Sequence, residues 1–406
     1  MTAPGTKPLI LEEFREESFS REAMPDPVGE FLWREYGSDP VRISVEFPSP
    51  KTKNRWELKN EGWAGLLPLG QDHTLVLQPK VPISNVFRML EFAYKLDVFR
   101  GPEDVVGADT MQEIYESLAR VLARRVRDRG RKGLHHTYVG REERLPVVRG
   151  RLDLRRLPRT GHDPRLHCQF EEHTADHPDN QILLDALDRI LRSAICRGQA
   201  RRETRGAHRM LKSAVSPARF TERDTLGRDY NRLNHDYRGL HALSRFFIAH
   251  TGPTQRFGSG QMTPFLIKMH DLFEAFVGAW LRENLPDGLS IQEQERGSYD
   301  PEGDVGYRID LVLTDDTGRT LAVLDTKYKR DQKPETQDVA QVVSYATKKG
   351  CSEAILIYPW DVGEGKAFRV GGIRVRSLGF PLRGDLDEAG MKIMNRLFRD
   401  SAKVVT

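Results

Sequence analysis

The stretch YRIDLVLTDDTGRTLAVLDTKYK, residues 307–329, predicts two β-strands joined by a turn. Both runs are rich in apolar residues, and the TDDTG between them favours a turn. Successive side chains of a strand point to opposite faces. We therefore expect one face of the first strand to carry Ile309, Leu311 and Leu313, and one face of the second to carry Leu321, Val323, Asp325 and Lys327.

Two acids and a lysine stand in these strands where apolar residues would pack better. If the strands pair as a hairpin, Asp310 can lie beside Asp325. Two carboxylates that close repel each other unless a cation lies between them, and hard oxygen ligands suit Mg²⁺. Lys327 can act on a water molecule or stabilise negative charge on a phosphate. Metal-assisted hydrolysis of a phosphodiester requires these parts.

The flanking segments fit the same site. Residues 336–350 predict a helix with Gln341 and Tyr345 on one face, and residues 353–359 predict a buried strand. A strand, a helix and a second strand in this order predict a parallel crossover. Upstream, Glu274 lies on a predicted helix at the edge of its apolar stripe, where its carboxylate can reach the same pocket.

The pattern resembles the core of PD-(D/E)xK nucleases. Asp310 is followed fifteen residues later by Asp325-Thr326-Lys327. The resemblance implies that Asp310, Asp325 and the Thr326 carbonyl bind a metal ion, and that Lys327 acts on the water or the phosphate. The chain departs from the motif at Ile309, which stands in place of proline at a position that carries no chemistry.

The same resemblance implies that Glu274, Gln341 and Tyr345 are supporting residues of the catalytic site. A D…DxK match arises by chance in many proteins of this size. The competing interpretation is a surface hairpin with a solvated Asp–Lys pair, with Tyr345 packed under the sheet. The strand context, the crossover helix and the upstream acid favour the nuclease.

Several other segments predict secondary structure. The first hundred residues contain short strand-like runs broken by Pro, Gly and Asn, and 252–264 has the composition of a linker. Apolar spacing predicts helices over 84–96, 108–129, 179–195 and 265–285. In the third helix, Asp179-Asn180 is expected to form the cap.

Together these segments predict an α+β or α/β protein. We expect a β-rich partner-docking domain over 1–105, a helical, arginine-rich region over 106–255, and a nuclease domain with a mixed sheet flanked by helices over 256–406. The arginine-rich stretch 124–159 is either a solvated basic surface or a contact for DNA phosphates or an acidic partner.

Bulk composition sets the class of protein. The chain has 406 residues and a formal charge of +4, which is compatible with nucleic acid without requiring it. Its three cysteines form no CxxC pair, the N-terminus does not read as a signal peptide, and no apolar run could cross a membrane. We therefore expect a cytoplasmic protein.

A zinc site is not expected from sequence spacing. Its candidate ligands are Cys168, His173, Asp176 and His177. They lack a fourth ligand in a known pattern. The cysteines are expected to be buried.

The order of blocks along the chain resembles the McrC family, the nuclease subunits of modification-dependent McrBC restriction systems. The similar blocks are LVLQPKVPISNVFRMLEFAY at 75–94, VVRGRLDL at 147–154, CQFEEHTADHPDNQILLDALDRIL at 168–191 and LFEAFVGAWL at 272–281. The resemblance extends from about residue 70 to 360.

The family resemblance implies a division of labour. A hexameric AAA+ GTPase of McrB type recognises double-stranded DNA with modified cytosine, and the McrC-like chain binds it, stimulates nucleotide hydrolysis and cuts with Mg²⁺. The partner would bind GTP or ATP, and this sequence agrees because it has no GxxxxGK[ST] motif. A finger of the N-terminal part is expected to enter the ring of the partner.

Two other functions compete with this interpretation. One is a stand-alone RecB-like nuclease that acts on DNA without a nucleotide-driven partner. The other is an adaptor that activates an AAA+ motor and does not cut. Retention of Asp310, Asp325 and Lys327 argues against the adaptor, because an unused site has little reason to keep three costly charges.

Overall fold

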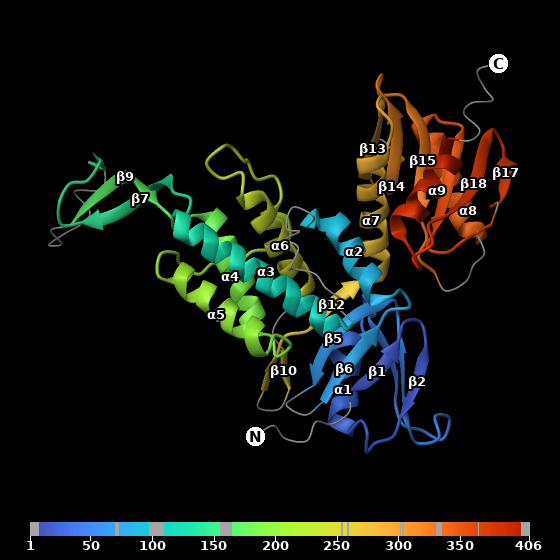
Figure 1. The fold of residues 1–406 in the computed structure, drawn as a ribbon, viewed down its shortest axis with the longest axis horizontal. Helices are drawn as coiled ribbons and strands as arrows, with labels where there is room; N and C mark the ends of the chain where they lie inside the picture. The colour runs from blue at the N-terminus through green and yellow to red at the C-terminus, as the bar shows by residue number, and fades with distance from the viewer. Residues whose placement is uncertain are drawn as a thin grey trace.

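The computed structural model describes residues 8–69, 73–96, 109–154, 165–252, 255–257, 260–300, 302, 304–329, 335–363 and 365–398. Figure 1 shows the N-terminal sheets in blue, green helices from which a β-hairpin projects, and the C-terminal sheet with its helices in orange and red. Parallel and antiparallel pairs occur in that C-terminal sheet. The prediction of an α+β fold with a mixed sheet flanked by helices is confirmed.

The described N-terminal residues form two small sheets and a helix. Their elements are β1 Leu9–Glu12, β2 Glu16–Phe19, α1 Asp26–Tyr36, β3 Ile43–Glu46, β4 Trp56–Asn60, β5 Trp63–Leu69 and β6 His73–Gln78. Trp56 of one sheet, Leu75 of the other and Phe31 of α1 are buried in the same apolar cluster. Sheet-on-sheet burial of alternate apolar residues therefore holds this region together.

The predicted helices of the first half are confirmed. They are α2 Ile83–Tyr94, α3 Met111–Lys132 and α4 Pro178–Arg192, and the structure adds α5 Gly198–Lys212, the short 3₁₀ helix η3 Arg223–Thr225 and α6 Tyr237–His250. A capping box between Thr110 and Glu113 defines the start of α3. None of the helices in the described ranges is long and apolar enough to cross a bilayer.

The expected cap of α4 is wrong. Pro178 occupies the first helical turn, so the helix begins earlier and His177 is its N-cap. Asn180 lies inside the first turn, where its side-chain amide donates to the carbonyl oxygens of His135 and Ala175. The side chain of Asn180 therefore joins distant segments and does not cap its own helix.

A three-stranded antiparallel sheet projects from the helices. It consists of β7 Thr137–Leu145, β8 Arg151–Leu152 and β9 Leu166–Thr174, in the order β7-β9-β8, and we call it the finger. Figure 1 shows the finger at one end of the long axis of the molecule and the C-terminal sheet at the other. Tyr138, Val147 and Val148 are exposed along it, at 68%, 68% and 58% of their surfaces.

The segment 252–264 is not only a linker, as its composition predicted. It contains an antiparallel pair, β10 Gln255–Phe257 and β11 Gly260–Met262. The following strand, β12 Phe265–Lys268, pairs with β5 of the N-terminal sheet, so the helix predicted from residue 265 starts only at Met269. Tertiary pairing overrides the helical spacing here. The ranges of the three predicted domains stay predictions.

A mixed sheet forms the C-terminal region. Its strands lie side by side in the order β13-β14-β15-β16-β18-β17. Along the chain, these strands and the helices around them are α7 Met269–Asn284, β13 Leu289–Ser298, β14 Gly306–Asp315, β15 Thr320–Thr326, α8 Thr336–Lys349, β16 Glu353–Tyr358, β17 Ala367–Val370, β18 Ile373–Gly379 and α9 Leu386–Phe398. The predicted hairpin is β14–β15, and the parallel crossover is β15–α8–β16. Apolar residues of α7 and α9 cover one face, and those of α8 cover the other.

The alternation expected along β14 and β15 is only partly present. Ile309 packs in the cluster under α8, whereas Leu311 and Leu313 pack in the larger core with α7. The pleat changes at Asp310, where the ladder with β13 skips Gln294, a residue with φ of 51°. Leu321 also packs against the larger core, beside a register shift between β14 and β15. Two irregularities therefore turn side chains to the face opposite the one predicted.

Candidate active site

The two predicted aspartates come together at the end of the β14–β15 hairpin. The ladder pairs Leu311 with Leu324, so Asp310 and Asp325 are the next residues along each strand. Asp310 Oδ2 accepts hydrogen bonds from the backbone N–H of Thr326 at 2.9 Å and from its hydroxyl at 3.0 Å. These two bonds hold the Asp310 carboxylate against Thr326, the residue that follows Asp325 in the sequence.

A chain of polar contacts runs from Asp325 to α8. Lys327 Nζ lies 2.6 Å from Asp325 Oδ2 and donates to Gln341 Oε1 at 2.9 Å. Gln341 Nε2 in turn donates to the Tyr345 hydroxyl at 2.8 Å. Because Gln341 and Tyr345 are four residues apart on one helix, α8 presents both to the lysine. The ammonium group of Lys327 is therefore fixed beside the acids.

Glu274 reaches the site from α7, on the other face of the sheet. Its neighbours Phe273 and Phe276 are fully buried in the core, which leaves its own side chain at the edge of that stripe. Glu274 is 3% exposed, and its Oε2 lies 3.6 Å from Arg308 Nη2. Its other oxygen, Oε1, is buried without a hydrogen-bond partner among the described residues.

Burial and mutual repulsion favour the protonated forms of these acids. Burial first, and then the charge of Asp310, raise the pKa of Asp325 to about 7, although Lys327 opposes the shift. The pKa of Glu274 is raised by the same two causes in the same order. A positive charge placed beside Asp325 and Glu274 would therefore stabilise the ionised form of each carboxylate.

The site residues fit a divalent cation. Asp310, Asp325 and Glu274 are three acids at most 8% exposed. The positive groups beside them are Lys327, next to Asp325, and Arg308, next to Glu274. Glu274 Oε1 is buried without a donor among the described residues, and Asp325 Oδ2 has the Lys327 ammonium beside it. Hard oxygen ligands of this kind suit Mg²⁺, and the imidazole of His270 lies beside Glu274.

The sequence interpretation missed several residues of the site. Asp338, 3% exposed, pairs with Lys329 at 2.9 Å and lies 3.8 Å from Lys327 Nζ. It stands three positions before Gln341 on the same helix, a spacing that could have revealed it. Arg308, which contacts Glu274, had no such signal because its partner lies on a different element.

The expectation for the cysteines is met. Cys168, Cys196 and Cys351 are buried and free. Burial raises the pKa of Cys196 to about 11 and also raises the pKa of Cys351. These two thiols are therefore poorly suited to act as nucleophiles.

Comparison with known families gives the site its context. The family described as McrBC 5-methylcytosine restriction system component matches residues 58–359, about three quarters of the chain. The chain belongs to this McrBC family. The matched range contains Glu274, the β14–β15 hairpin and the Gln341–Tyr345 pair. The McrC resemblance of the sequence blocks is thereby confirmed.

Relatives of this McrBC protein agree in sequence and fold. The type IV methyl-directed restriction enzyme EcoKMcrBC of Escherichia coli (strain K12) is 21% identical over 306 residues, which cover 70% of this chain and 87% of the relative. A chain in the refined half-complex from a tetradecameric assembly of Thermococcus gammatolerans McrB AAA+ hexamers with bound McrC is 16% identical. That chain matches with a TM-score of 0.55, over 96% of this protein and 100% of its own length. At this identity the likeness shows a shared fold.

Proposed function

We propose that this chain is the nuclease subunit of an McrBC-type restriction system and acts as a metal-dependent endodeoxyribonuclease. The observation that carries the proposal is the buried set of Asp310, Asp325 and Glu274 with Lys327 at the end of β15. Membership of the McrBC family supports a role in restriction. The buried and free cysteines fit activity in a reducing cytoplasm.

Asp310, Asp325 and the Thr326 carbonyl would hold Mg²⁺, with Glu274 beside them. A bound Mg²⁺ lowers the pKa of water and neutralises charge on a phosphate. Thr326 orients the Asp310 carboxylate through its amide and hydroxyl. The raised pKa of Asp325 means that this group must lose its proton when a cation binds.

Lys327 supplies the fixed positive charge of the site. Its ammonium group lies against Asp325 and is held by the side-chain oxygen of Gln341, so little reorganisation is needed when negative charge develops on the phosphate. Tyr345 keeps Gln341 in place by accepting its amide N–H. Gln341 and Tyr345 therefore act by positioning the lysine.

We further propose that the chain binds and stimulates a hexameric AAA+ NTPase of McrB type, which binds GTP or ATP and recognises double-stranded DNA with modified cytosine. The solved assembly that this fold resembles contains McrB AAA+ hexamers with bound McrC. The finger suits the docking role, because it projects far from the C-terminal sheet and exposes apolar residues that include Val147 and Val148.

A reconstituted cleavage assay tests the proposal. It contains the full chain, its AAA+ partner, Mg²⁺, nucleotide, and plasmid DNA with or without modified cytosine. Asp325→Asn and Lys327→Ala should each lower the rate of cutting by about 10²–10⁴-fold and leave partner binding and NTPase stimulation intact. Lys392→Ala, which removes an exposed lysine paired with Glu388 on α9, should cut normally.

Each other outcome has a definite meaning. Full cutting by both site variants would remove the assignment of the active site. Cutting by the wild-type chain with Mg²⁺ alone would favour the stand-alone nuclease. Stimulation of the NTPase without any cutting would favour the adaptor. Calorimetric titration with Mg²⁺ should show binding to the wild type and its loss in Asp310→Ala.

A further inference from the structure

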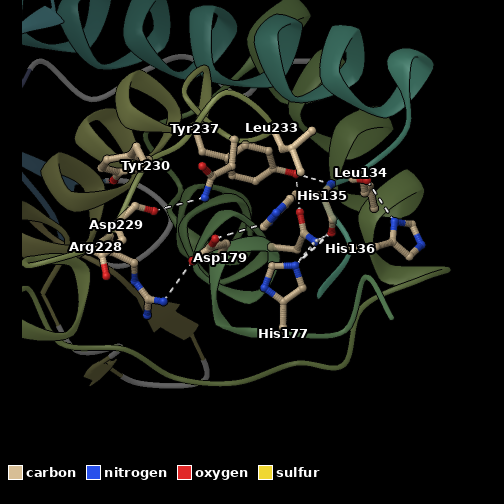
Figure 2. A network of polar contacts seen from close by, with 12 residues as sticks. Leu134, His135, His136, His177, Asp179, Arg228, Asp229, Tyr230, Leu233 and Tyr237 are labelled. Carbon is tan, nitrogen blue, oxygen red and sulfur yellow. Dashed lines mark hydrogen bonds and ion pairs between the residues drawn. The ribbon is translucent and has the colours of Figure 1, made fainter. Parts of the chain in front are cut away.

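Three side chains that commonly bind metals meet at the root of the finger. His135 lies two residues before β7, and His177 and Asp179 follow β9 at the start of α4. One ligand atom from each lies within 4.8 Å of the others. Figure 2 shows the imidazole of His135 pointing at the Asp179 carboxylate, with the His177 ring beside them. The group thus joins the chain that enters the finger to the chain that leaves it.

The separation of two of these atoms fits a shared ion. His135 Nδ1 lies 3.5 Å from Asp179 Oδ2. Two ligands bound at about 2.0–2.1 Å in a tetrahedral site lie roughly 3.3–3.5 Å apart. His135 Nδ1 is also buried without a hydrogen-bond partner among the described residues. This geometry places a positive group between the nitrogen and the carboxylate oxygen: the Nδ1 proton in the ion-free protein, or a bound cation that replaces it.

Hydrogen bonding leaves His177 with a free ligand atom. Its Nε2 lies 2.8 Å from the His135 carbonyl oxygen, which can only accept, so Nε2 carries the proton and donates. The two N–H groups of the Asn180 amide are already donated to the carbonyls of His135 and Ala175. In the tautomer with this Nε2–H, the lone pair of the ring lies on Nδ1. Metal-binding histidines usually donate their other N–H to a carbonyl in this way.

The remaining ligand is also held in place. Arg228 Nη1 donates to Asp179 Oδ1 at 2.9 Å, which leaves Oδ2 turned toward His135. The Tyr237 hydroxyl accepts the backbone N–H of His135 and donates to Asn180 Oδ1. Figure 2 shows how these contacts surround the three ligands. The outer contacts fix the ligands before any ion is bound.

This set differs from the zinc ligands considered in the sequence. Asp176 Oδ1 accepts from Gln181 and from the backbone of Ser216, and Cys168 Sγ lies against the Val147 carbonyl. Neither belongs to the group at the root of the finger. Of the residues considered there, only His177 takes part.

We propose that His135, His177 and Asp179 bind a divalent transition-metal ion such as Zn²⁺. Two imidazoles and one carboxylate are ligands that suit Zn²⁺, and three protein ligands leave a fourth position for water. The ion links the segment before β7 to the segment after β9, and so holds the direction of the finger relative to α3 and α4. The site is independent of the nuclease function proposed above.

Metal binding to the full-length chain tests this site directly. Zn²⁺ and Co²⁺ are titrated by calorimetry, and the visible absorption of Co²⁺ reports its ligands. All proteins carry Asp325→Asn, which weakens binding at the nuclease acids. His135→Gln and Asp179→Asn should each lose one bound equivalent. His136→Gln is the matched control, because its side chain is exposed and lies outside the group.

Thermal unfolding separates loss of metal from loss of fold. Without metal, His135→Gln should unfold cooperatively at a melting temperature only slightly below that of the parent, because it loses a long contact with Asp179 and edge contacts of the ring with His177 and Tyr237. Zn²⁺ should raise the melting temperature of the parent and of His136→Gln but not of His135→Gln. Absence of a bound equivalent in the parent, or an equivalent that survives His135→Gln and Asp179→Asn, would overturn the proposal.

Discussion

At the scale of single residues, Asp325 combines burial with repulsion. It is 1% exposed, and burial and the nearby Asp310 raise its pKa to about 7. An unfolded chain has an aspartate pKa of about 3.9. The folded protein therefore keeps a proton on Asp325 over a range in which the unfolded chain has lost it. Stability from this group is full at low pH and falls as pH rises through that range.

This asymmetry predicts a pH-dependent effect of Asp325→Asn. The variant should gain free energy of unfolding relative to wild type between about pH 5 and about pH 8, by on the order of 2 kcal/mol, since asparagine has no proton to lose. Urea unfolding at the two pH values with a chelator present measures the difference. Asp315→Asn is the control, because hydrogen bonding by Thr317 lowers the pKa of Asp315. Parallel pH profiles for wild type and Asp325→Asn would contradict the prediction.

At the scale of elements, α9 approaches α7 through a glycine. Gly390 of α9 lies directly against the indole of Trp280 on α7, and both are buried in the core below the C-terminal sheet. A Cβ at Gly390 would collide with that ring. Close contact between these two helices thus depends on the absence of a side chain, and this contact supports the helix that carries Glu274.

Gly390→Ala should destabilise the protein by about 1–3 kcal/mol, because the added methyl group overpacks the core. Gly206→Ala is the matched control. It also places a methyl group on a helix, but open space surrounds that position in α5, so it should stabilise by about 0.5–1 kcal/mol. Urea unfolding of the three proteins measures both effects. A Gly390→Ala variant as stable as wild type would show that the helices part at little cost.

The finger is the second element with a testable role, which rests on the proposed function. Gly140 pairs with Glu171 across β7 and β9, so an Asn-Gly turn can join these two residues and remove the rest of the finger. The shortened chain should fold and lower affinity for the AAA+ partner at least about tenfold. Binding and NTPase assays measure this. Val370→Ser, on the exposed edge strand β17, is the control. Unchanged partner binding by the shortened chain would exclude the finger as the docking element.

At the scale of the whole molecule, buried polar contacts join the first strands to the nuclease sheet. Glu13, fully buried after β1, accepts from the Tyr328 hydroxyl, one residue beyond Lys327, and from the backbone N–H of Lys80. Burial raises the pKa of Glu13 to about 7. Asn85 of α2 donates to the carbonyls of Leu382 and Gly384. The β-rich region and the C-terminal region therefore share contacts next to the candidate site.

Tyr328→Phe removes one of these contacts and should cost about 1–3 kcal/mol of stability, because a buried carboxylate loses a donor. Tyr299→Phe removes a hydroxyl that binds Ser344 at the surface, and its effect should stay within about 0.5 kcal/mol. Denaturant unfolding of the two variants measures the contrast. Equal stability of both would mean that the contact between the regions contributes nothing.

The sequence by itself determined the local features of this protein. The spacing of apolar residues located α2, α3, α4 and α8, and the β14–β15 hairpin followed from the composition of its strands and turn. Asp310, Asp325, Lys327, Gln341 and Tyr345 were found because neighbours on a hairpin or one helical turn have fixed separations in sequence. Their catalytic roles stay predictions.

Only the tertiary structure decided which distant segments meet. It paired β12 with β5, turned Ile309 to the face opposite the one expected, and brought Glu13 into hydrogen-bond contact with the Tyr328 hydroxyl. It also brought His135 to His177, forty-two residues later in the chain. Contacts of this kind have no characteristic spacing. They result from how helices and sheets pack to bury apolar surface, and this depends on the whole chain at once.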